Sequence, residues 1–158
     1  MAALSNFHPL LSEWFFSRHD QPTDVQEKAW PKIASGSHVL VTAPTGSGKT
    51  LTAFFWSINQ FASGALAPGE TRVLYVSPLK ALNNDIQRNL VSPLEEIQAV
   101  FKSKGHHFPE IKALTRSGDT SQEDRRKMFR HPPEILITTP ESLNLMLSSK
   151  SGQRLLYN

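Results

Sequence analysis

Residues 43–50 read Ala43-Pro44-Thr45-Gly46-Ser47-Gly48-Lys49-Thr50. The preceding residues 38–42 form a short apolar run rich in β-branched side chains, which predicts a buried strand. The following residues 51–58 place apolar side chains at helical spacing. A strand, a glycine-bearing loop and a helix in this order are the context that a phosphate-binding loop requires. An ordinary Gly-Ser turn, the alternative, does not account for the flanking strand and helix.

The residue types of this loop suit a polyphosphate. Gly46 and Gly48 lack a Cβ, so the backbone can curl tightly and approach a ligand closely. The loop N–H groups and the N-terminus of the next helix would then face the phosphate oxygens. We expect Lys49 to contact the β- and γ-phosphates and the Thr50 hydroxyl to ligate Mg²⁺. Because Ala43 stands where the generic pattern has glycine, the loop alone does not identify a family.

Length and composition describe an ordinary globular chain. It has 158 residues, 39% of them hydrophobic and 20% charged, which suits one domain with a real core. The net charge of +3 is compatible with a nucleic-acid partner. The absence of cysteine excludes disulfides, thiol catalysis and cysteine-ligated zinc. No apolar stretch has the length of a membrane span or the pattern of a signal peptide, so we expect a cytoplasmic protein.

Residues 1–37 are predicted to form N-terminal helices that precede the main domain, residues 38–158. Within residues 5–19, four large apolar side chains share one helical face and are expected to pack on the core: Leu10, Leu11, Trp14 and Phe15.

A second helix opens at Thr23 and is expected to stop near Pro31. Thr23 and Gln26 have the spacing of a capping box, in which each side chain bonds the backbone of the other. The Gln26 amide could instead pair with the N6/N7 edge of adenine. The spacing leaves both roles open and favours the cap.

Further strands are predicted over residues 72–76, 111–115 and 134–138, each followed by a helical pattern. This alternation predicts an α/β fold with a parallel sheet and right-handed crossovers. Four helix starts are predicted from capping residues: Ser77, Ser92, Thr120 and Thr139. The adjacent pair His106-His107 has no third ligand nearby in the sequence, so we expect no metal there.

Functional residues of a parallel sheet gather where strands feed helices, at the carboxyl edge. The polar segments of this chain lie at such junctions, in residues 43–50, 77–83, 116–120 and 139–142. The first is suited to a triphosphate. The others offer helix N-termini with lysine and arginine, which suit a phosphodiester backbone.

Together these segments resemble, in order, the motifs of the superfamily 2 helicases and, among them, the Lhr-type (large helicase-related) proteins. Pro22-Thr23 with Gln26 resembles the adenine-reading Q motif, and residues 43–50 resemble motif I, including its first alanine. Motif Ia is resembled by Ser77-Pro78-Leu79-Lys80-Ala81-Leu82-Asn83-Asn84-Asp85. A further strand-contacting motif is resembled by Arg116-Ser117-Gly118-Asp119-Thr120. Motif Ib is resembled by Ile137-Thr138-Thr139-Pro140-Glu141-Ser142-Leu143. Ser117 departs mildly from the usual threonine.

The resemblance implies a RecA-like P-loop NTPase domain, with helices on both faces of a parallel sheet. It implies ATP and Mg²⁺ as cofactors, with Thr23 and Gln26 beside the nucleotide and residues 43–50 around its phosphates. It also implies a nucleic-acid partner, DNA in preference to RNA. The residues expected to contact that strand are Pro78, Lys80, Asn83, Arg116, Gly118, Thr139, Pro140 and Glu141.

Two parts of the resembled motor are missing from these 158 residues. No Asp-Glu-x-His box occurs, although in the family its acidic residues hold Mg²⁺ and activate water. The second RecA-like domain is also absent. The chain therefore resembles the first two thirds of a first motor domain, without its C-terminal strands, and we expect nucleotide binding without appreciable ATP turnover.

Two alternatives remain open at the level of sequence. One is a non-hydrolysing P-loop module that binds a nucleotide as a structural ligand. The other is a small P-loop kinase, which needs an acidic residue for Mg²⁺ or as a base. Asp119 and Glu141 are the acids placed for that role, and both look like helix-start residues instead.

Overall fold

The computed structural model describes residues 2–78 and 86–157. Lys80 and Asn83, two of the expected strand contacts, lie outside the described residues. The chain divides into two compact units, and each is formed by two separate segments. Unit 1 comprises Met1–Ala65 and Asp85–Phe108, and unit 2 comprises Leu66–Asn84 and Pro109–Asn158.

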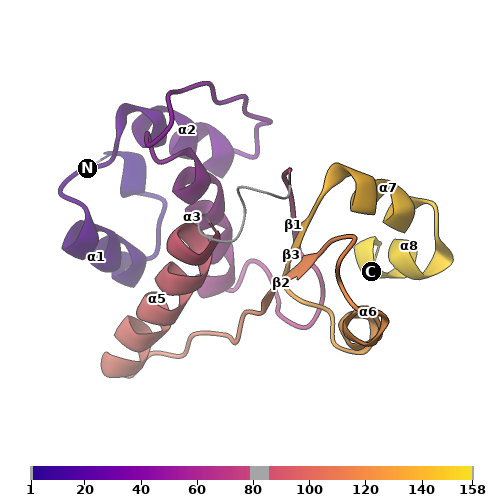
Figure 1. Ribbon diagram of the computed structural model, residues 1–158. Coiled ribbons are helices and arrows are strands. Elements are labelled where there is room, and N and C mark those ends of the chain that lie inside the picture. Colours follow the sequence, from indigo (N-terminus) through magenta and orange to yellow (C-terminus); the bar gives the residue numbers. More distant parts are fainter. Residues whose placement is uncertain (1, 79–85, 158) are drawn as a thin grey trace. The chain divides into compact units, whose positions relative to one another are not determined.

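Unit 1 is helical (Figure 1). Its core is aromatic, because the rings of Phe15, Trp30 and Phe55 lie with their centroids 5.5 to 5.6 Å apart. All three side chains are fully buried, and large aromatic rings contribute most of the apolar area of such a core. The elements of this unit are η1 (Ala2–Leu4), α1 (Pro9–Arg18), α2 (Asp24–Ala34), α3 (Lys49–Ala62), η3 (Gln87–Val91) and α5 (Ser92–Ser103).

The two N-terminal helices follow most of the sequence prediction. Helix α1 buries the predicted face, formed by Leu10, Leu11, Trp14 and Phe15. Helix α2 begins after Thr23 as expected but continues through Pro31 to Ala34, so the predicted stop at the proline is wrong.

Residues 38–42 are irregular, and the prediction of a strand there is wrong. Leu40 is 90% exposed. Strand backbone needs a hydrogen-bonded neighbour, and none of the described strands pairs with this segment. The apolar pattern predicts a preference for a sheet but cannot supply the partner strand.

Unit 2 contains a three-stranded parallel sheet in the order β1-β3-β2, formed by β1 (Val73–Val76), β2 (Ala113–Arg116) and β3 (Ile135–Thr138) (Figure 1). All four residues of the central strand β3 are buried, which agrees with the continuous apolar run of a strand covered on both faces. The helices that the structure describes in this unit are α6 (Gln122–Arg130), α7 (Pro140–Leu147) and α8 (Lys150–Leu156). The predicted α/β class with a parallel sheet is confirmed.

Leu136 of β3 packs against Met146 of α7 and Leu155 of α8, which form a small apolar core. The predicted apolar set of α7 is only partly buried, because Leu145 and Leu147 stay exposed. Helix α8 has no counterpart in the sequence prediction.

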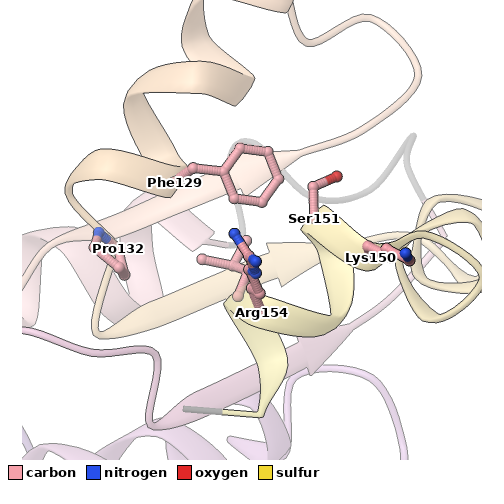
Figure 2. A pocket seen from close by; sticks show the side chains of 6 residues that line it. Phe129, Pro132, Lys150, Ser151 and Arg154 are labelled. Atoms are coloured by element: carbon pink, nitrogen blue, oxygen red, sulfur yellow. The ribbon is translucent and has the colours of Figure 1, made fainter.

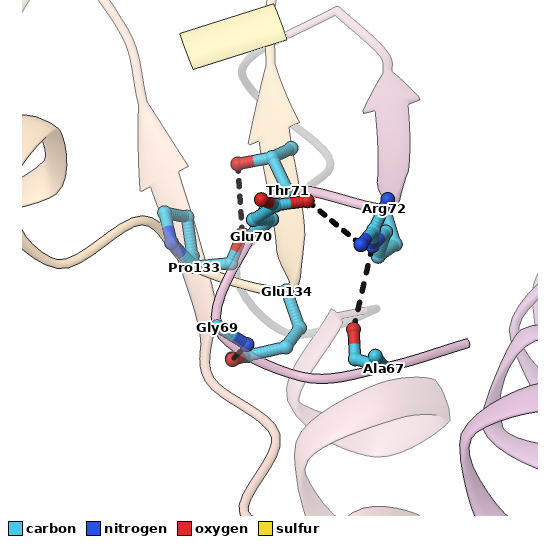
Figure 3. Close-up of polar contacts among 7 residues, drawn as sticks. All are labelled: Ala67, Gly69, Glu70, Thr71, Arg72, Pro133 and Glu134. Carbon is cyan, nitrogen blue, oxygen red and sulfur yellow. Dashed lines mark hydrogen bonds and ion pairs between the residues drawn. The ribbon is translucent and has the colours of Figure 1, made fainter. Parts of the chain in front are cut away.

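Glu134 lies just before β3 and joins the segments that lead into β1 and β2. Figure 3 shows its side chain beside Gly69, on the β1 side. Its side chain is 5% exposed, and its carboxylate oxygens accept hydrogen bonds from the N–H groups of Gly69 and Lys112, both at 2.7 Å. Its carbonyl accepts from the N–H groups of Arg72 and Val73, both at 3.0 Å. One acidic residue therefore anchors the segments that lead into β1 and β2.

Two of the predicted helix starts need correction. Thr120 does not cap α6, because its hydroxyl accepts from the Ser117 N–H at 2.8 Å and Ser121 is the N-cap. Ser92 does not cap α5, because η3 is a π-helical turn that runs directly into it with helical backbone at Val91. Thr139 caps α7 as predicted. Among the described residues, no helix has the length and apolar character needed to cross a membrane.

Candidate functional site

The predicted phosphate loop lies in unit 1, immediately before α3. Gly46 and Gly48 have φ angles of 84° and 82°, in the left-handed region that favours glycine. Gly48 is the N-cap of α3, so the cap residue has no side chain to cover the first N–H groups of the helix. The positive φ angles agree with the expectation that glycine at both positions lets the backbone curl tightly.

The Lys49 side chain folds back across the loop. Its ammonium donates hydrogen bonds to the carbonyl oxygens of Ala43 at 2.5 Å and Pro44 at 2.6 Å. The loop therefore already encloses a positive charge at the start of α3. A phosphate oxygen would compete with these carbonyls for the same ammonium.

Thr23 and Gln26 form the predicted capping box at the start of α2, and this role is confirmed. The Gln26 carbonyl oxygen accepts from the Thr23 N–H at 2.9 Å. The same two residues lie against the phosphate loop, because the Thr23 hydroxyl donates to the Ser47 carbonyl at 3.0 Å. A Cβ on Gly48 would lie 2.9 Å from the Gln26 amide nitrogen. The adenine-reading role of Gln26 stays a prediction.

The base of the loop is held by buried polar contacts. The Thr52 hydroxyl donates to the Gly48 carbonyl at 2.8 Å, and the Trp30 indole N–H donates to the Thr52 carbonyl at 3.0 Å. The first bond lies within the start of α3, and the second attaches α3 to α2. In the described part of the chain, the Ser47 hydroxyl oxygen is buried without a hydrogen-bond partner.

Thr50, the expected magnesium ligand, is the second residue of α3 and is partly buried. The described residues contain no group of three or more His, Cys, Asp or Glu side chains that could hold a metal. A magnesium ion at Thr50 stays a prediction that depends on the nucleotide for its remaining ligands.

The other predicted site residues lie in unit 2, at the carboxyl edge of its sheet. The ends of the three strands are bonded to one another there, since the Thr138 hydroxyl donates to the Arg116 carbonyl at 2.7 Å and the Ser77 N–H donates to the Thr138 carbonyl at 3.0 Å. The structure thus brings the described members of the predicted strand-contacting set to one edge, namely Pro78, Arg116, Gly118, Thr139, Pro140 and Glu141.

The members of this set differ in exposure. Pro78, Gly118, Pro140 and Glu141 are exposed, and the last two belong to the first turn of α7. Thr139 is 2% exposed because its side chain caps α7, accepting from the Ser142 N–H at 3.3 Å.

Arg116 is 9% exposed, and its guanidinium lies 5.5 Å from the centre of the Phe129 ring. Its position at the strand end is as predicted, but its side chain is directed into the packing of α6.

Sequence reasoning missed Arg125. The sequence patterns assigned no structural role to this side chain, yet the Arg125 guanidinium donates to the carbonyls of Ser117 at 3.2 Å and Gly118 at 3.1 Å. A signal was available, because Arg125 and Phe129 are four residues apart and so share one face of α6.

A cavity of about 560 Å³ lies between α6 and α8 (Figure 2). None of the predicted site residues lines it. The residues that do are Phe129, Pro132, Lys150, Ser151, Arg154 and Leu155.

Comparison with protein families gives a match over most of the chain. The family described as DEAD/DEAH box helicase matches residues 23–157.

Curated relatives resemble the chain closely over a small part of their own length. The "Lhr helicase/ probable uracil glycosylase" of Mycolicibacterium smegmatis is 50% identical over 153 residues, which are 96% of this chain and 10% of the relative. The "Lhr helicase/uracil glycosylase" of Escherichia coli is 44% identical over 94% of this chain and 10% of the relative. The chain thus spans about a tenth of the length of these relatives.

Solved structures give the same picture. A structure of the Mycobacterium smegmatis helicase Lhr bound to ssDNA and AMP-PNP superposes with a TM-score of 0.88 at 49% identity, covering 98% of this chain and 19% of that one. A structure of the DUF1998 helicase MrfA bound to DNA and AMPPNP has a TM-score of 0.74 at 24% identity, covering 96% of this chain and 20% of that one. The latter likeness supports the fold alone.

Proposed function

Because this chain belongs to the DEAD/DEAH box helicase family, we propose that it is the ATP-binding and nucleic-acid-binding front part of a superfamily 2 helicase of the Lhr type. The observation that carries the proposal is the contact between the Thr23–Gln26 capping box and the phosphate loop. It places a buried amide beside the loop that would hold the phosphates. If the phosphates of a nucleotide bind to this loop, its base would lie close enough for the Gln26 amide to bind it.

The side chains at the loop divide the work of binding. The Lys49 ammonium exchanges its two carbonyl partners for the β- and γ-phosphate oxygens, and backbone N–H groups at the start of α3 add hydrogen bonds. The Thr50 hydroxyl contributes one ligand to Mg²⁺. Gln26 binds the adenine edge through its amide while its backbone remains part of α2.

In unit 2, the exposed residues at the carboxyl edge of the sheet contact one strand of nucleic acid. The likeness to an Lhr structure bound to ssDNA supports DNA as that strand. The first turn of α7 and the turn after β2 offer N–H groups to the backbone phosphates.

Hydrolysis of ATP and movement along the strand belong to the longer protein in this proposal. The 158 residues contain no Asp-Glu-x-His box, which in the resembled family holds Mg²⁺ and activates water. This chain alone is therefore expected to bind ATP and to hydrolyse it no faster than the uncatalysed background.

The test is ATP binding by the purified chain, measured calorimetrically with and without Mg²⁺. We expect Lys49→Ala to weaken binding roughly tenfold or more, because it removes a charge-assisted contact worth about 1.5–3 kcal/mol. Lys28→Ala is the matched control, since it removes an equal charge from an exposed position on α2. Wild-type chain that binds no ATP, or equal losses in both variants, would contradict the proposal.

The role of Gln26 is tested by specificity. Gln26→Ala weakens the cap as well as any contact to the base, so affinity alone does not separate the two roles. The ratio of ATP to GTP affinity does, because a cap does not distinguish bases. We expect the preference for ATP to fall severalfold in Gln26→Ala, and an unchanged ratio would show that Gln26 acts only as a cap.

A further inference from the structure

The turn between β2 and α6 is shaped by one guanidinium. The Arg125 Nη2 donates to the carbonyl oxygens of Ser117 at 3.2 Å and Gly118 at 3.1 Å. The turn is closed by the Thr120 N–H, which donates to the Ser117 carbonyl at 3.3 Å. Two successive carbonyls therefore face Arg125.

The peptide geometry fixes where the neighbouring N–H groups point. In a trans peptide the C=O and the following N–H point in opposite directions, and the described chain has no cis peptide. The N–H groups of Gly118 and Asp119 therefore point away from Arg125. Both residues are exposed, and across the described ranges neither N–H donates a hydrogen bond to the protein. Successive N–H groups presented to one side are a common way to bind an anion.

The charges behind this turn also favour an anion. Arg116 lies at the end of β2, and the pKa of its guanidinium is lowered first by burial and then by the nearby charge of Arg125. The Arg116 Nη1 and the Arg125 Nε are both buried without a hydrogen-bond partner within residues 2–78 and 86–157.

No carboxylate of the described residues forms an ion pair with either arginine. The one acidic side chain on the turn, Asp119, is exposed to solvent. Two cations held close together without a counter-ion repel each other, and a bound anion would offset that repulsion.

We infer that Arg125 is a positioning residue, which holds the turn after β2 so that the N–H groups of Gly118 and Asp119 bind one phosphate of a single nucleic-acid strand. Arg125 does not touch the phosphate, because its donors face the opposite side of the peptides. The inference rests on the proposed function, which lays a strand along this edge of the sheet. To the contact already proposed for this turn it adds Arg125, the residue that orients the N–H donors.

The direct test is an NMR titration of the ¹⁵N-labelled chain with a ten-nucleotide single-stranded oligothymidylate at low salt. We expect the amide signals of Gly118 and Asp119 to shift downfield on binding, as hydrogen bonds to phosphate form. Inorganic phosphate is titrated in a second sample, so that a site for a free anion is distinguished from a site for a strand.

The second test compares two neighbouring arginines on α6. Arg125→Met keeps the apolar stem and removes the donors, and Arg126→Met removes the same charge from an exposed position. We expect oligonucleotide affinity to fall roughly tenfold in Arg125→Met and less than about twofold in Arg126→Met. Arg125→Lys should restore part of the affinity, because an ammonium can still donate to the two carbonyls. Amide spectra of each variant show whether it is folded.

The outcomes separate the inference from the function on which it rests. If the oligonucleotide shifts the amide signals next to Pro140 but not those of Gly118 and Asp119, the inference is overturned, while strand binding still holds. Equal losses for the two methionine variants would also overturn it, because affinity would then depend only on net charge. Shifts with inorganic phosphate and none with the strand would assign the turn to a free anion instead. An ATP-binding chain that binds no strand at all would overturn both the inference and the nucleic-acid part of the proposed function.

Discussion

Gly48 and Gln26 illustrate how one residue limits another across the phosphate loop. Gly48 has a positive φ, which any side chain would make costly, and its missing Cβ leaves the space that the Gln26 amide occupies. Gly46 has the same backbone conformation with open space around it. The two glycines thus share a backbone requirement and differ in their neighbours.

This difference predicts unequal effects of the same substitution. Gly46→Ala should lower the free energy of unfolding by about 1–2 kcal/mol, the cost of the left-handed conformation. Gly48→Ala should cost about 1 kcal/mol more, because its Cβ also displaces Gln26. Urea denaturation of both variants measures the difference.

The double variant Gly48→Ala with Gln26→Ala checks the cause. If the extra cost arises from the contact, removing the Gln26 amide should return the loss at Gly48 to the value seen at Gly46. An extra cost that persists in the double variant would place its origin elsewhere in the loop.

For single residues, the sequence predicted the features that depend only on the local geometry of the backbone. The glycines of the loop and the cap formed by Thr23 and Gln26 follow from spacing alone, and both were found. The spacing of Arg125 and Phe129 indicates that they share a helix face, but the carbonyl partners of Arg125 were not predicted, because they lie in a turn whose path only the folded chain defines. The roles of the remaining candidate residues toward ligands stay predictions.

Among the strands and helices, the sheet of unit 2 depends on an acidic residue at its amino edge. Glu134 immediately precedes the central strand β3, and its carboxylate accepts hydrogen bonds from the segments before β1 and β2. Figure 3 shows the contact with Gly69, on the β1 side. Its carboxylate is buried, so each of the two backbone donors would lose its partner inside the protein if the carboxylate were removed.

Glu134→Ala should therefore lower the free energy of unfolding by about 3 kcal/mol, since hydrogen bonds to a charged group contribute about 1.5–3 kcal/mol each. Thermal unfolding followed by circular dichroism measures this loss. Glu110→Ala is the control, because Glu110 is exposed and its ion pair with Lys112, at 3.4 Å, is worth well under about 1 kcal/mol. Similar losses in the two variants would contradict the anchoring role of Glu134.

The strands show which part of an element a sequence can predict. The central strand β3 was found because three of its four residues are large and apolar and its pairing partners are present on both sides. Residues 38–42 have a similar pattern and no described partner, and they remain irregular. The cap of α6 was displaced by one residue because two adjacent hydroxyl residues, Thr120 and Ser121, compete for it.

At the scale of the whole molecule, a contact between distant parts of the chain joins the two segments of unit 1. The Trp14 indole N–H donates to the Glu96 carboxylate at 2.9 Å, across 82 residues. Glu96 also pairs with Arg18 at 2.9 Å on the surface. This contact connects α1 with α5.

Glu96→Ala should lower the free energy of unfolding of unit 1 by about 1–2 kcal/mol, because it leaves a buried indole N–H without its acceptor. Tryptophan fluorescence in urea is a selective probe, since Trp14, Trp30 and Trp56 all belong to unit 1. Glu95→Ala, an exposed neighbour on the same helix, should shift the fluorescence transition by much less. Equal shifts would mean that the indole contact does not contribute.

Both units are built from segments that alternate along the chain, and this order has a consequence for synthesis on the ribosome. The first 65 residues emerge with the phosphate loop and α3 but without α5, whose residues appear only after the first strand of the other unit has been made. Until α5 has been made, part of the aromatic surface of the nascent helices remains exposed to solvent. Slow translation between residues 66 and 84 would lengthen the time for which this aromatic surface is exposed. Chaperones would then bind mainly to that surface.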